Sequence, residues 1–324
     1  MGLDEPPLGW LHTFQVGSSY PLTNYSSRYN LFLLLTAVGS GFRKIIKNLF
    51  EVLFLEEKLD LVTGNFYEYE TELLSITSRM MIYRNDDYFS MNDDRIVISR
   101  RVANLTSACR MYLDQCIHHI TNLYGKDSNL VTLIKKEMST QYENYLGYRV
   151  MEAFRNYIQH RGAPVHGVWF SYDRIGTDEQ SKLLHIVRPY IKPQIIEEDR
   201  KFKRKILEEM KEISVKDEID IRPLIREYVE GIGKIHEKIR EVIKSDVEKW
   251  QNVLESTLTK FEKESGSNKT ISTLDIVIDE IDENRWSEQH TIFKDFIERR
   301  QALEKKNGPF NNLAKCFVTN EVRK

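Results

Sequence analysis

The sequence predicts a mainly α-helical protein, built as an up-and-down helical bundle with a small β-hairpin and a long C-terminal helix. Charged residues make up 30% of the 324 residues, and only 8 residues are proline, a composition typical of long helices. Apolar residues recur at steps of three and four along most of the chain. Hydrophobic residues reach 41% and aromatic residues 11%, which is enough to form a substantial core.

Changes in composition and in apolar spacing divide the chain into five parts. The Ser265–Lys269 segment is the clearest linker, because it is short, polar and rich in glycine and serine. The predicted parts are an N-terminal arm (1–41), a helical bundle (42–165), a β-hairpin insert (166–194), long charged helices that pack on the bundle or dimerise (195–264), and a C-terminal helical tail (265–324).

The N-terminal arm has little regular pattern. It contains several prolines and glycines, and its best candidate strand is Trp10–Val16. The apolar segment 30–38 fits a strand or a short helix equally well.

The bundle is predicted to contain four helical stretches. The first covers 42–59, and a turn at Thr63-Gly64-Asn65 separates it from a second stretch of the same spacing. The next helix starts at Asp94 and ends at Gly125. A helix from about residue 129 to His160 follows, and Gly162 and Pro164 end it. Because the loop between the last two helices is short, we expect them to lie antiparallel.

The period changes after Pro164. Segments 166–172 and 183–189 read as two strands around a polar turn, with the N-terminal strand as a candidate third. A helix of roughly 65 Å is then expected from 220 to 262. Its apolar seam steps four and three from Ile221 to Val242 and shifts by one place at Ile243. This helix either closes the bundle or forms an arm for dimerisation. A last helix is predicted at about 287–306.

Three polar residues at the end of the 129–160 helix are not required by any core. Arg155, Asn156 and His160 match the needs of phosphodiester cleavage. Histidine can act as a base or an acid near neutral pH. Arginine offers a planar set of donors for phosphate oxygens, and the amide can orient either partner.

The sequence Arg155-Asn156-x-x-x-His160 resembles the R-x(4–6)-H motif of the HEPN superfamily, including the polar residue after the arginine. The resemblance covers about residues 40–165. It implies a HEPN-like helical bundle and a metal-independent endoribonuclease of the kind found in prokaryotic toxin and antiphage defence systems. It also implies a homodimer with a composite active site, an RNA substrate, and a neutralising or activating protein partner.

The resemblance assigns roles to the three motif residues. His160 is expected to act as base or acid, Arg155 to clamp the phosphate, and Asn156 to orient the pair. On an ideal helix Arg155 and His160 lie about 140° apart, so the arginine must reach round, the last turn must re-aim the histidine, or a second copy must supply one half. Further candidate substrate-binding residues are Arg100, Arg101, Arg161 and His166.

Two rival interpretations remain open at this stage. The first is a non-catalytic helical scaffold, an inactive HEPN relative that binds a partner helix along the 221–258 seam. The second is a metal-dependent nuclease that uses the acidic residues of the 85–94 segment, which are Asp86, Asp87, Asp93 and Asp94. The same residues are more simply explained as turn and helix-capping residues.

Other features restrict the class of protein. The net charge is −2, so no overall attraction to nucleic acid is expected. Cys109 and Cys116 are expected to be reduced core residues, and the first 25 residues lack the pattern of a signal peptide. No apolar run is long enough to span a membrane, and no metal or cofactor motif is present. We therefore expect a cytoplasmic protein without a cofactor, a metal or a membrane partner.

Overall fold

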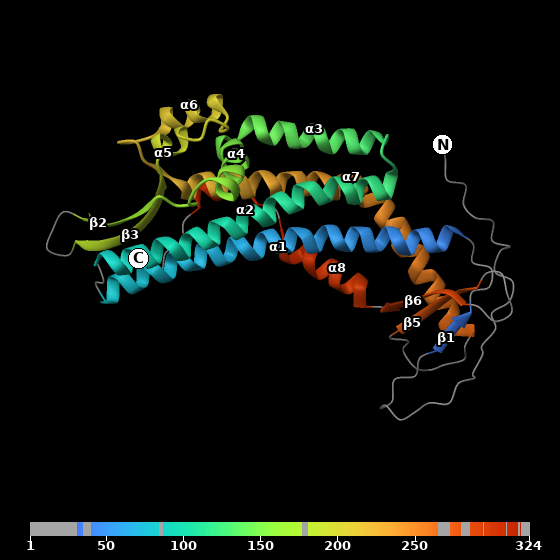
Figure 1. Cartoon of the computed structure of the whole chain (residues 1–324). Coiled ribbons are helices and arrows are strands. Elements are labelled where there is room, and N and C mark those ends of the chain that lie inside the picture. Colours follow the sequence, from blue (N-terminus) through green and yellow to red (C-terminus); the bar gives the residue numbers. More distant parts are fainter. Residues whose placement is uncertain are drawn as a thin grey trace. The chain divides into compact units, whose positions relative to one another are not determined.

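A computed structural model of the chain describes residues 31–34, 40–83, 87–176, 181–264, 273–279, 286–293, 295–308, 310–316 and 318. These residues are mainly helical, with a small antiparallel sheet that contains a β-hairpin (Figure 1). The predicted fold class is thereby confirmed. None of the described helices combines the length and the apolar character needed to cross a bilayer.

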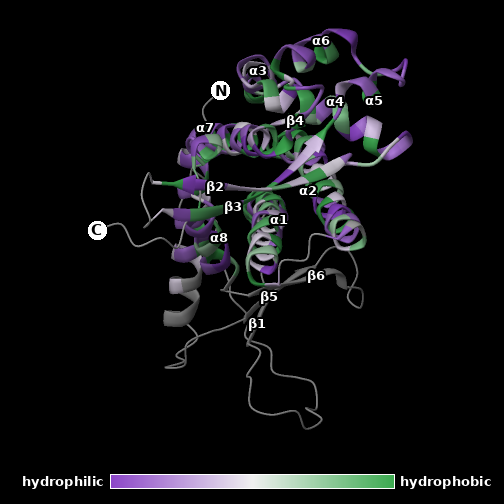
Figure 2. Ribbon diagram, turned by 90° about the vertical axis from the view of Figure 1, so that its left-hand side faces the viewer, coloured by the Kyte–Doolittle hydropathy of each residue, from purple (hydrophilic) through white to green (hydrophobic). Residues whose placement is uncertain are grey.

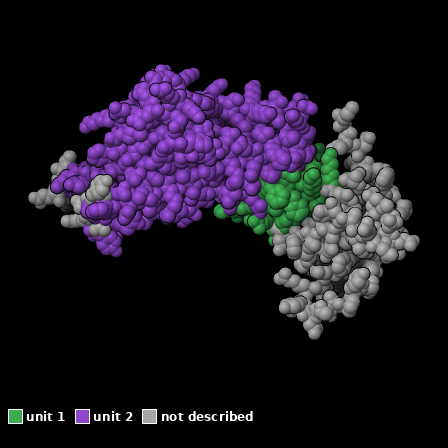
Figure 3. Space-filling view, in the orientation of Figure 1, with its two compact units in different colours: residues 1–56, 243–306 green, residues 57–242, 307–324 purple. Residues whose placement is uncertain are grey.

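The described chain forms two compact units, which Figure 3 shows in different colours. The larger unit comprises residues 57–242 and 307–324, and the smaller comprises 1–56 and 243–306. The boundary between them falls within two long helices, α1 and α7. The longer helices are α1 (Ser40–Tyr83), α2 (Tyr88–Tyr124), α3 (Asn129–Asn144), α4 (Leu146–His160) and α7 (Ile221–Glu264).

The helix α1 runs without interruption through the turn predicted at Thr63-Gly64-Asn65, so that prediction is wrong. Both polar side chains of the triplet bond to the preceding turn of the same helix. Thr63 Oγ1 donates to the carbonyl of Asp60 at 3.0 Å, and Asn65 Nδ2 donates to the carbonyl of Leu61 at 2.8 Å. Because the side chains are satisfied inside the helix, they do not end it.

The helix α2 begins earlier than the predicted Asp94. Its N-cap is Asp87, whose carboxylate accepts the backbone N–H groups of Phe89 and Ser90. Gly125 ends the helix with φ of 86°, as predicted. The capping interpretation of the acidic segment is therefore correct for Asp87.

The predicted continuous helix from 129 to 160 is broken at Tyr145, whose φ of −113° and ψ of 117° are extended. Groups from α7 stabilise the break. Tyr145 donates its hydroxyl to Glu230 at 3.0 Å, and the free N–H of Gly147 donates to Glu227 at 2.7 Å. The Glu227 carboxylate thus satisfies a backbone donor in the first turn of α4. As a result, α4 turns away from α3 and crosses α7.

The core of the larger unit is organised around α7. The apolar seam residues Ile221, Ile225, Tyr228, Ile232, Ile235 and Ile239 are all buried within the chain. Figure 2 shows apolar residues where the helices face one another and polar residues outside. Of the two interpretations left open, this part of α7 therefore closes the bundle.

The hairpin consists of β2 (Gly167–Ile175) and β3 (Lys182–Ile191), which pair antiparallel, as predicted. The third strand of this sheet is β4 (Ile219–Asp220), which pairs with the end of β3. The predicted strand Trp10–Val16 lies outside the described residues. Two short helices, α5 (Pro193–Glu197) and α6 (Arg204–Ile213), connect β3 to β4.

The smaller unit contains a second sheet of order β1-β5-β6. It consists of β1 (Leu31–Leu34), β5 (Thr273–Asp279) and β6 (Trp286–Phe293), and α8 (Asp295–Lys306) follows. The ambiguous segment 30–38 thus contains a strand. The helix predicted at 287–306 is wrong over its first residues, because β6 pairs there with β5. The linker 265–269 lies outside the described residues. The last helix among the described residues is a short 3₁₀ helix, Leu313–Lys315.

The crossing of α4 and α7 depends on Gly147. A Cβ atom there would lie 2.8 Å from Leu224 Cα and 2.8 Å from Glu227 Cβ, so one backbone would have to move. We expect Gly147→Ala to lower the free energy of unfolding by about 1–3 kcal/mol through overpacking. Chemical denaturation measures the change.

Gly64→Ala is the matched control, because a Cβ atom at this site in α1 meets nothing within 4 Å. Alanine is the better helix former, so this variant should be more stable by about 0.5–1 kcal/mol. Equal effects of the two substitutions would contradict a close α4–α7 contact.

Candidate functional site

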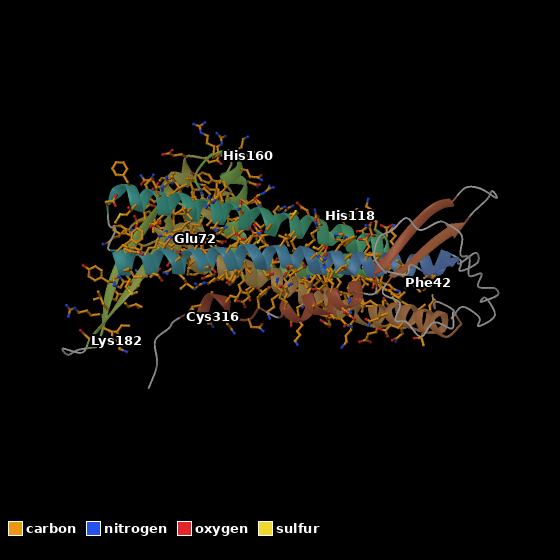
Figure 4. The ribbon with its side chains drawn as sticks, turned by 90° about the horizontal axis from the view of Figure 1, so that it is seen from below. Phe42, Glu72, His118, His160, Lys182 and Cys316 are labelled. Carbon is orange, nitrogen blue, oxygen red and sulfur yellow. The ribbon has the colours of Figure 1, made fainter. Side chains whose placement is uncertain are left out.

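The candidate site lies on the outer face of α4. Residues Gly147, Tyr148, Val150, Met151, Ala153, Phe154 and Tyr157 are buried and fix the inner face of the helix. Asn156 and His160 are exposed, and Arg155 is half-buried at the edge of the outer face. In Figure 4, His160 lies at the outer edge of the bundle. The packing of α4 therefore turns the polar residues of the motif toward solvent.

Arg155 has an unusual environment for an arginine of this unit. Its Nη1 donates to Asn156 Oδ1 at 3.1 Å, and its Nε is buried without an acceptor among the described residues. Within the same described part of the chain, no carboxylate forms an ion pair with Arg155. Its neighbours differ: Arg110 pairs with Glu152 at 2.9 Å, and Arg149 pairs with Glu209 at 2.9 Å. The guanidinium of Arg155 thus carries a positive charge that no described acid neutralises.

Asn156 lies between the two ends of the motif. It lies four residues before His160, which places the two side chains one turn apart on the same face of α4. Because Arg155 reaches toward Asn156, the order across the outer face is arginine, amide, histidine. The hydrogen bond joins Arg155 to the amide only, and His160 follows one turn later on the same face. Within the described residues, the ring of His160 has no hydrogen-bond partner.

The other candidate arginines fall into different environments. Arg100 is exposed, without an ion pair in the described ranges. Arg101 pairs with Glu68 and, at 3.3 Å, with Glu72, so its guanidinium connects α2 to α1. Arg161 follows α4 and pairs with Asp199 at 3.3 Å.

His166 is held by the backbone of β3's end and by the ring of Tyr157. Its Nδ1 accepts the backbone N–H of Lys192 at 2.8 Å, and its Nε2 is buried without a partner in the described structure. Burial, and then the charges of Lys192 and Arg95, lower the pKa of His166 to about 4. His166 is therefore neutral at pH 7 and anchors the start of the hairpin.

The start of α2 lies near the end of α4, as the short loop between the antiparallel helices predicted. Arg95 Nη1 donates to the carbonyl of Val165 at 3.3 Å, five residues after His160. The described acidic residues of the predicted metal site lie at the N-cap and in the first turns of α2. Asp87 caps α2 and Asp94 pairs with Arg79 at 2.6 Å, while Asp86 is outside the described residues. No group of three or more metal-ligating side chains is found in the described ranges.

Two features near the motif were missed from the sequence. Glu152, one turn before Asn156, accepts from the hydroxyl of Tyr228 on α7 and pairs with Arg110 on α2. In the sequence, this role is indicated by a carboxylate between the apolar residues Val150, Met151, Ala153 and Phe154. The second feature is the basic run Arg200–Lys205, which the balanced charge of segment 195–264 concealed.

The chain was compared with known families, proteins and structures. No family model matches it, and no curated protein or solved structure is significantly similar to it. The functional argument therefore depends on the motif and on the geometry around it.

The buried environment of His166 makes the free energy of unfolding depend on pH. Its pKa is about 4 in the folded protein and about 6.5 when unfolded, so the unfolded chain binds more protons between these values. The contribution of neutral His166 to the free energy of unfolding is present above pH 6.5 and is lost as the pH falls toward 4. We expect the free energy of unfolding to fall more in the wild type than in His166→Asn over this range, because the amide oxygen can accept from Lys192 without taking up a proton. Urea denaturation at several pH values measures the difference, and an NMR titration of His166 with a midpoint at or above pH 6.5 would contradict it.

Proposed function

We propose that this protein is a metal-independent endoribonuclease of the HEPN type that acts as a dimer in the cytoplasm. By the resemblance of its motif, its role is that of a toxin or antiphage defence nuclease, held in check or triggered by a protein partner. The residues that carry the reaction are Arg155, Asn156 and His160, and no metal or cofactor takes part.

The observation that carries this proposal is the charge of Arg155. A half-buried guanidinium without an acidic partner is unfavourable in the free protein, because desolvation is not offset by an ion pair. A bound anion would remove this cost. The exposed His160, one turn after Asn156 on the same face of α4, is the group that would act on such an anion. An arginine and a histidine beside one phosphate supply charge stabilisation and one of the two proton transfers needed for cleavage at an RNA 2′-hydroxyl.

The reaction proceeds by internal attack. A base removes the proton of the 2′-hydroxyl, and the oxygen attacks the adjacent phosphorus in line with the 5′ oxygen. The bond from phosphorus to the 5′ oxygen breaks as an acid protonates the leaving oxygen. The products are a 2′,3′-cyclic phosphate and a 5′-hydroxyl. Arg155 stabilises the charge on the non-bridging oxygens.

A second copy of the chain supplies the second proton-transfer group. One histidine cannot remove one proton and donate another in the same step. Asn156 and His160 are exposed on one side of α4, so the outer faces of two α4 helices can enclose a phosphate between them. The open face thus supports a composite site across a two-fold axis.

The rival scaffold interpretation has less support. It requires a free seam on α7, and from Ile221 to Ile239 the seam residues are already buried in the chain's own core. The metal interpretation is likewise weakened, since Asp87 serves as a helix cap and Asp94 is paired with Arg79.

The direct test is cleavage of RNA in the presence of EDTA. The substrates are a folded transfer RNA and a mixed-sequence single-stranded oligonucleotide. We expect the wild type to cut with a 2′,3′-cyclic phosphate end. We expect His160→Ala and Arg155→Ala to lower the rate by about 10²–10⁴-fold, the usual range for loss of a proton-transfer or charge-stabilising group.

The matched control is Gln159→Ala, which changes an exposed residue of the same turn and should leave the rate unchanged. Circular dichroism checks that all variants are folded. The proposal is wrong if the wild type does not cut either RNA, or if all variants cut equally.

The composite site predicts that an inactive subunit inactivates its partner. When wild-type and His160→Ala proteins are mixed in equal amounts and allowed to exchange subunits, about half of the dimers become heterodimers with a single histidine. We expect the cleavage rate of the mixture to fall to about half of its value before exchange, because only about a quarter of the dimers then keep both histidines. An unchanged rate, with exchange shown by mass spectrometry, would contradict a shared site.

A further inference from the structure

The segment Arg200–Lys205 is the most concentrated run of positive charge near the motif. Five of its six residues are basic, and all five are exposed. We call these five residues the basic strip: Arg200, Lys201, Lys203, Arg204 and Lys205. The sixth residue, Phe202, is buried and anchors the strip to the core.

Local structure turns the strip outward. The backbone N–H of Phe202 donates to the carbonyl of Asp199 at 2.9 Å, which makes a tight turn before α6. In α6, Ile206, Leu207 and Met210 are buried, so the residues before them face solvent. The phenyl ring of Phe202 and these apolar residues together hold the strip on the surface.

The charges of the strip are only partly neutralised. Arg204 pairs with Glu197 at 3.1 Å, and Lys203 Nζ lies 5.5 Å from the ring centroid of Tyr142. In the part of the chain that the structure describes, Arg200, Lys201 and Lys205 have no acidic partner within ion-pair distance. Three lysines of α7 differ, because Lys234, Lys238 and Lys249 each pair with an acid three residues away.

The position of the strip at the N-terminus of α6 is unfavourable for the stability of that helix. The N-cap of α6 is Lys203, which forms no capping hydrogen bond, and the first turn of the helix has no acidic residue. Helix N-termini favour Ser, Asp and other acceptors and disfavour cations. The residues of the strip are therefore not those that would best stabilise α6.

Two ion pairs fix the strip beside the motif. Near the start of α4, Arg149 pairs with Glu209 of α6, and just after the end of α4, Arg161 pairs with Asp199. The chain from 199 to 209 therefore runs alongside α4 in the opposite direction. Figures 1 and 2 show α4, α5 and α6 side by side. In their own segments, the strip and Arg155 both lie between the residues that form these two ion pairs.

We infer that the basic strip binds the sugar–phosphate backbone of a single-stranded RNA and leads it across α4 to Arg155. This inference rests on the proposed function. Lysine and arginine side chains without acidic partners bind phosphates with release of counterions, largely without regard to sequence. A single strand is required because the 2′ oxygen, the phosphorus and the leaving oxygen must align, which a regular A-form helix prevents.

The test separates binding from cleavage by using His160→Ala as the background. Binding of a fluorescein-labelled mixed-sequence 20-nucleotide RNA is measured by anisotropy at several salt concentrations. The strip variant carries Arg200→Gln, Lys201→Gln and Lys205→Gln. We expect a loss of affinity of about 10–100-fold, and a decrease of about 2 in the slope of log K against log salt for three lost contacts.

The matched control removes three other exposed lysines, by Lys126→Gln, Lys135→Gln and Lys136→Gln. These residues lie in the loop before α3 and in its first half, at the opposite end of α3 from α4. The net charge changes equally in both variants, and we expect the control to bind RNA within about twofold of the background protein. Equal losses in the two variants would show an effect of net charge only and would overturn the inference.

A second variant, Lys203→Asp, separates structure from binding. It introduces an N-cap acceptor, so the protein should be at least as stable to heat as the wild type while it binds RNA more weakly. A destabilised protein with unchanged RNA affinity would contradict a binding role.

The remaining outcomes are also decisive. If the background protein does not bind the RNA, the inference is wrong. It is also wrong if the strip variant keeps its RNA affinity but loses binding to phosphatidylcholine–phosphatidylglycerol vesicles, since the strip would then recognise lipid headgroups. If RNA binding depends on the basic strip but the wild type cleaves no RNA, RNA binding by the strip is supported and the nuclease activity is rejected. If RNA cleavage depends on His160 but not on the strip, the nuclease activity is supported and RNA binding by the strip is rejected.

Discussion

The close approach of α4 to α7 at Gly147 determines the direction of the helix that carries the motif. No side chain larger than hydrogen fits against the backbone of Leu224, so the two helices meet at one crossing point. The break at Tyr145 and the carboxylate of Glu227 at the first turn of α4 allow this crossing. If α4 had continued the line of α3, its outer face would have a different orientation. The exposure of Asn156 and His160 thus follows from a backbone contact more than a turn away.

A half-buried carboxylate adds a second constraint. Glu152 accepts from Tyr228 on α7 and pairs with Arg110 on α2, and burial raises the pKa of the Tyr228 hydroxyl well above its usual value, so the hydroxyl remains a donor. Apolar packing alone would allow α4 to rotate between neighbours of similar shape. Directional bonds to two helices fix that rotation, and Arg155 lies three residues later on the same helix. Glu152 therefore serves to position the motif and does not belong to its chemistry.

The sequence predicts features that depend on one segment and misses those that depend on distant partners. The seam from Ile221 to Ile239, the glycine end of α2 and the paired strands of the hairpin follow from local spacing and turn chemistry. Thr63 and Asn65 are typical turn residues, but their side chains form hydrogen bonds to the carbonyls of Asp60 and Leu61 within α1, so the helix continues. The residues of β6 fit a helical pattern, but pairing with β5 makes them a strand.

The same distinction applies to the candidate site. The order of Arg155, Asn156 and His160 on one helix end could be read from their spacing. The ion pairs of Arg101 with two glutamates of α1 could not be predicted from spacing, because they depend on which helix lies beside α2. The position of the basic strip also depends on tertiary contacts, since Arg149 and Arg161 pair with Glu209 and Asp199 of a segment later in the chain.

The distribution of charge distinguishes the residues that stabilise the fold from those available to a ligand. Arg101, Arg110 and Arg149 each connect two segments by pairing with an acid, and substitution of any of them would leave a carboxylate without its partner. Arg155, Arg200 and Lys205 connect nothing that the structure describes, yet they lie along neighbouring segments between the same two ion pairs. Like charges placed close together repel one another and lower the stability of the folded protein. An extended polyanion is the ligand that would relieve this repulsion along its whole length, and RNA is such a ligand.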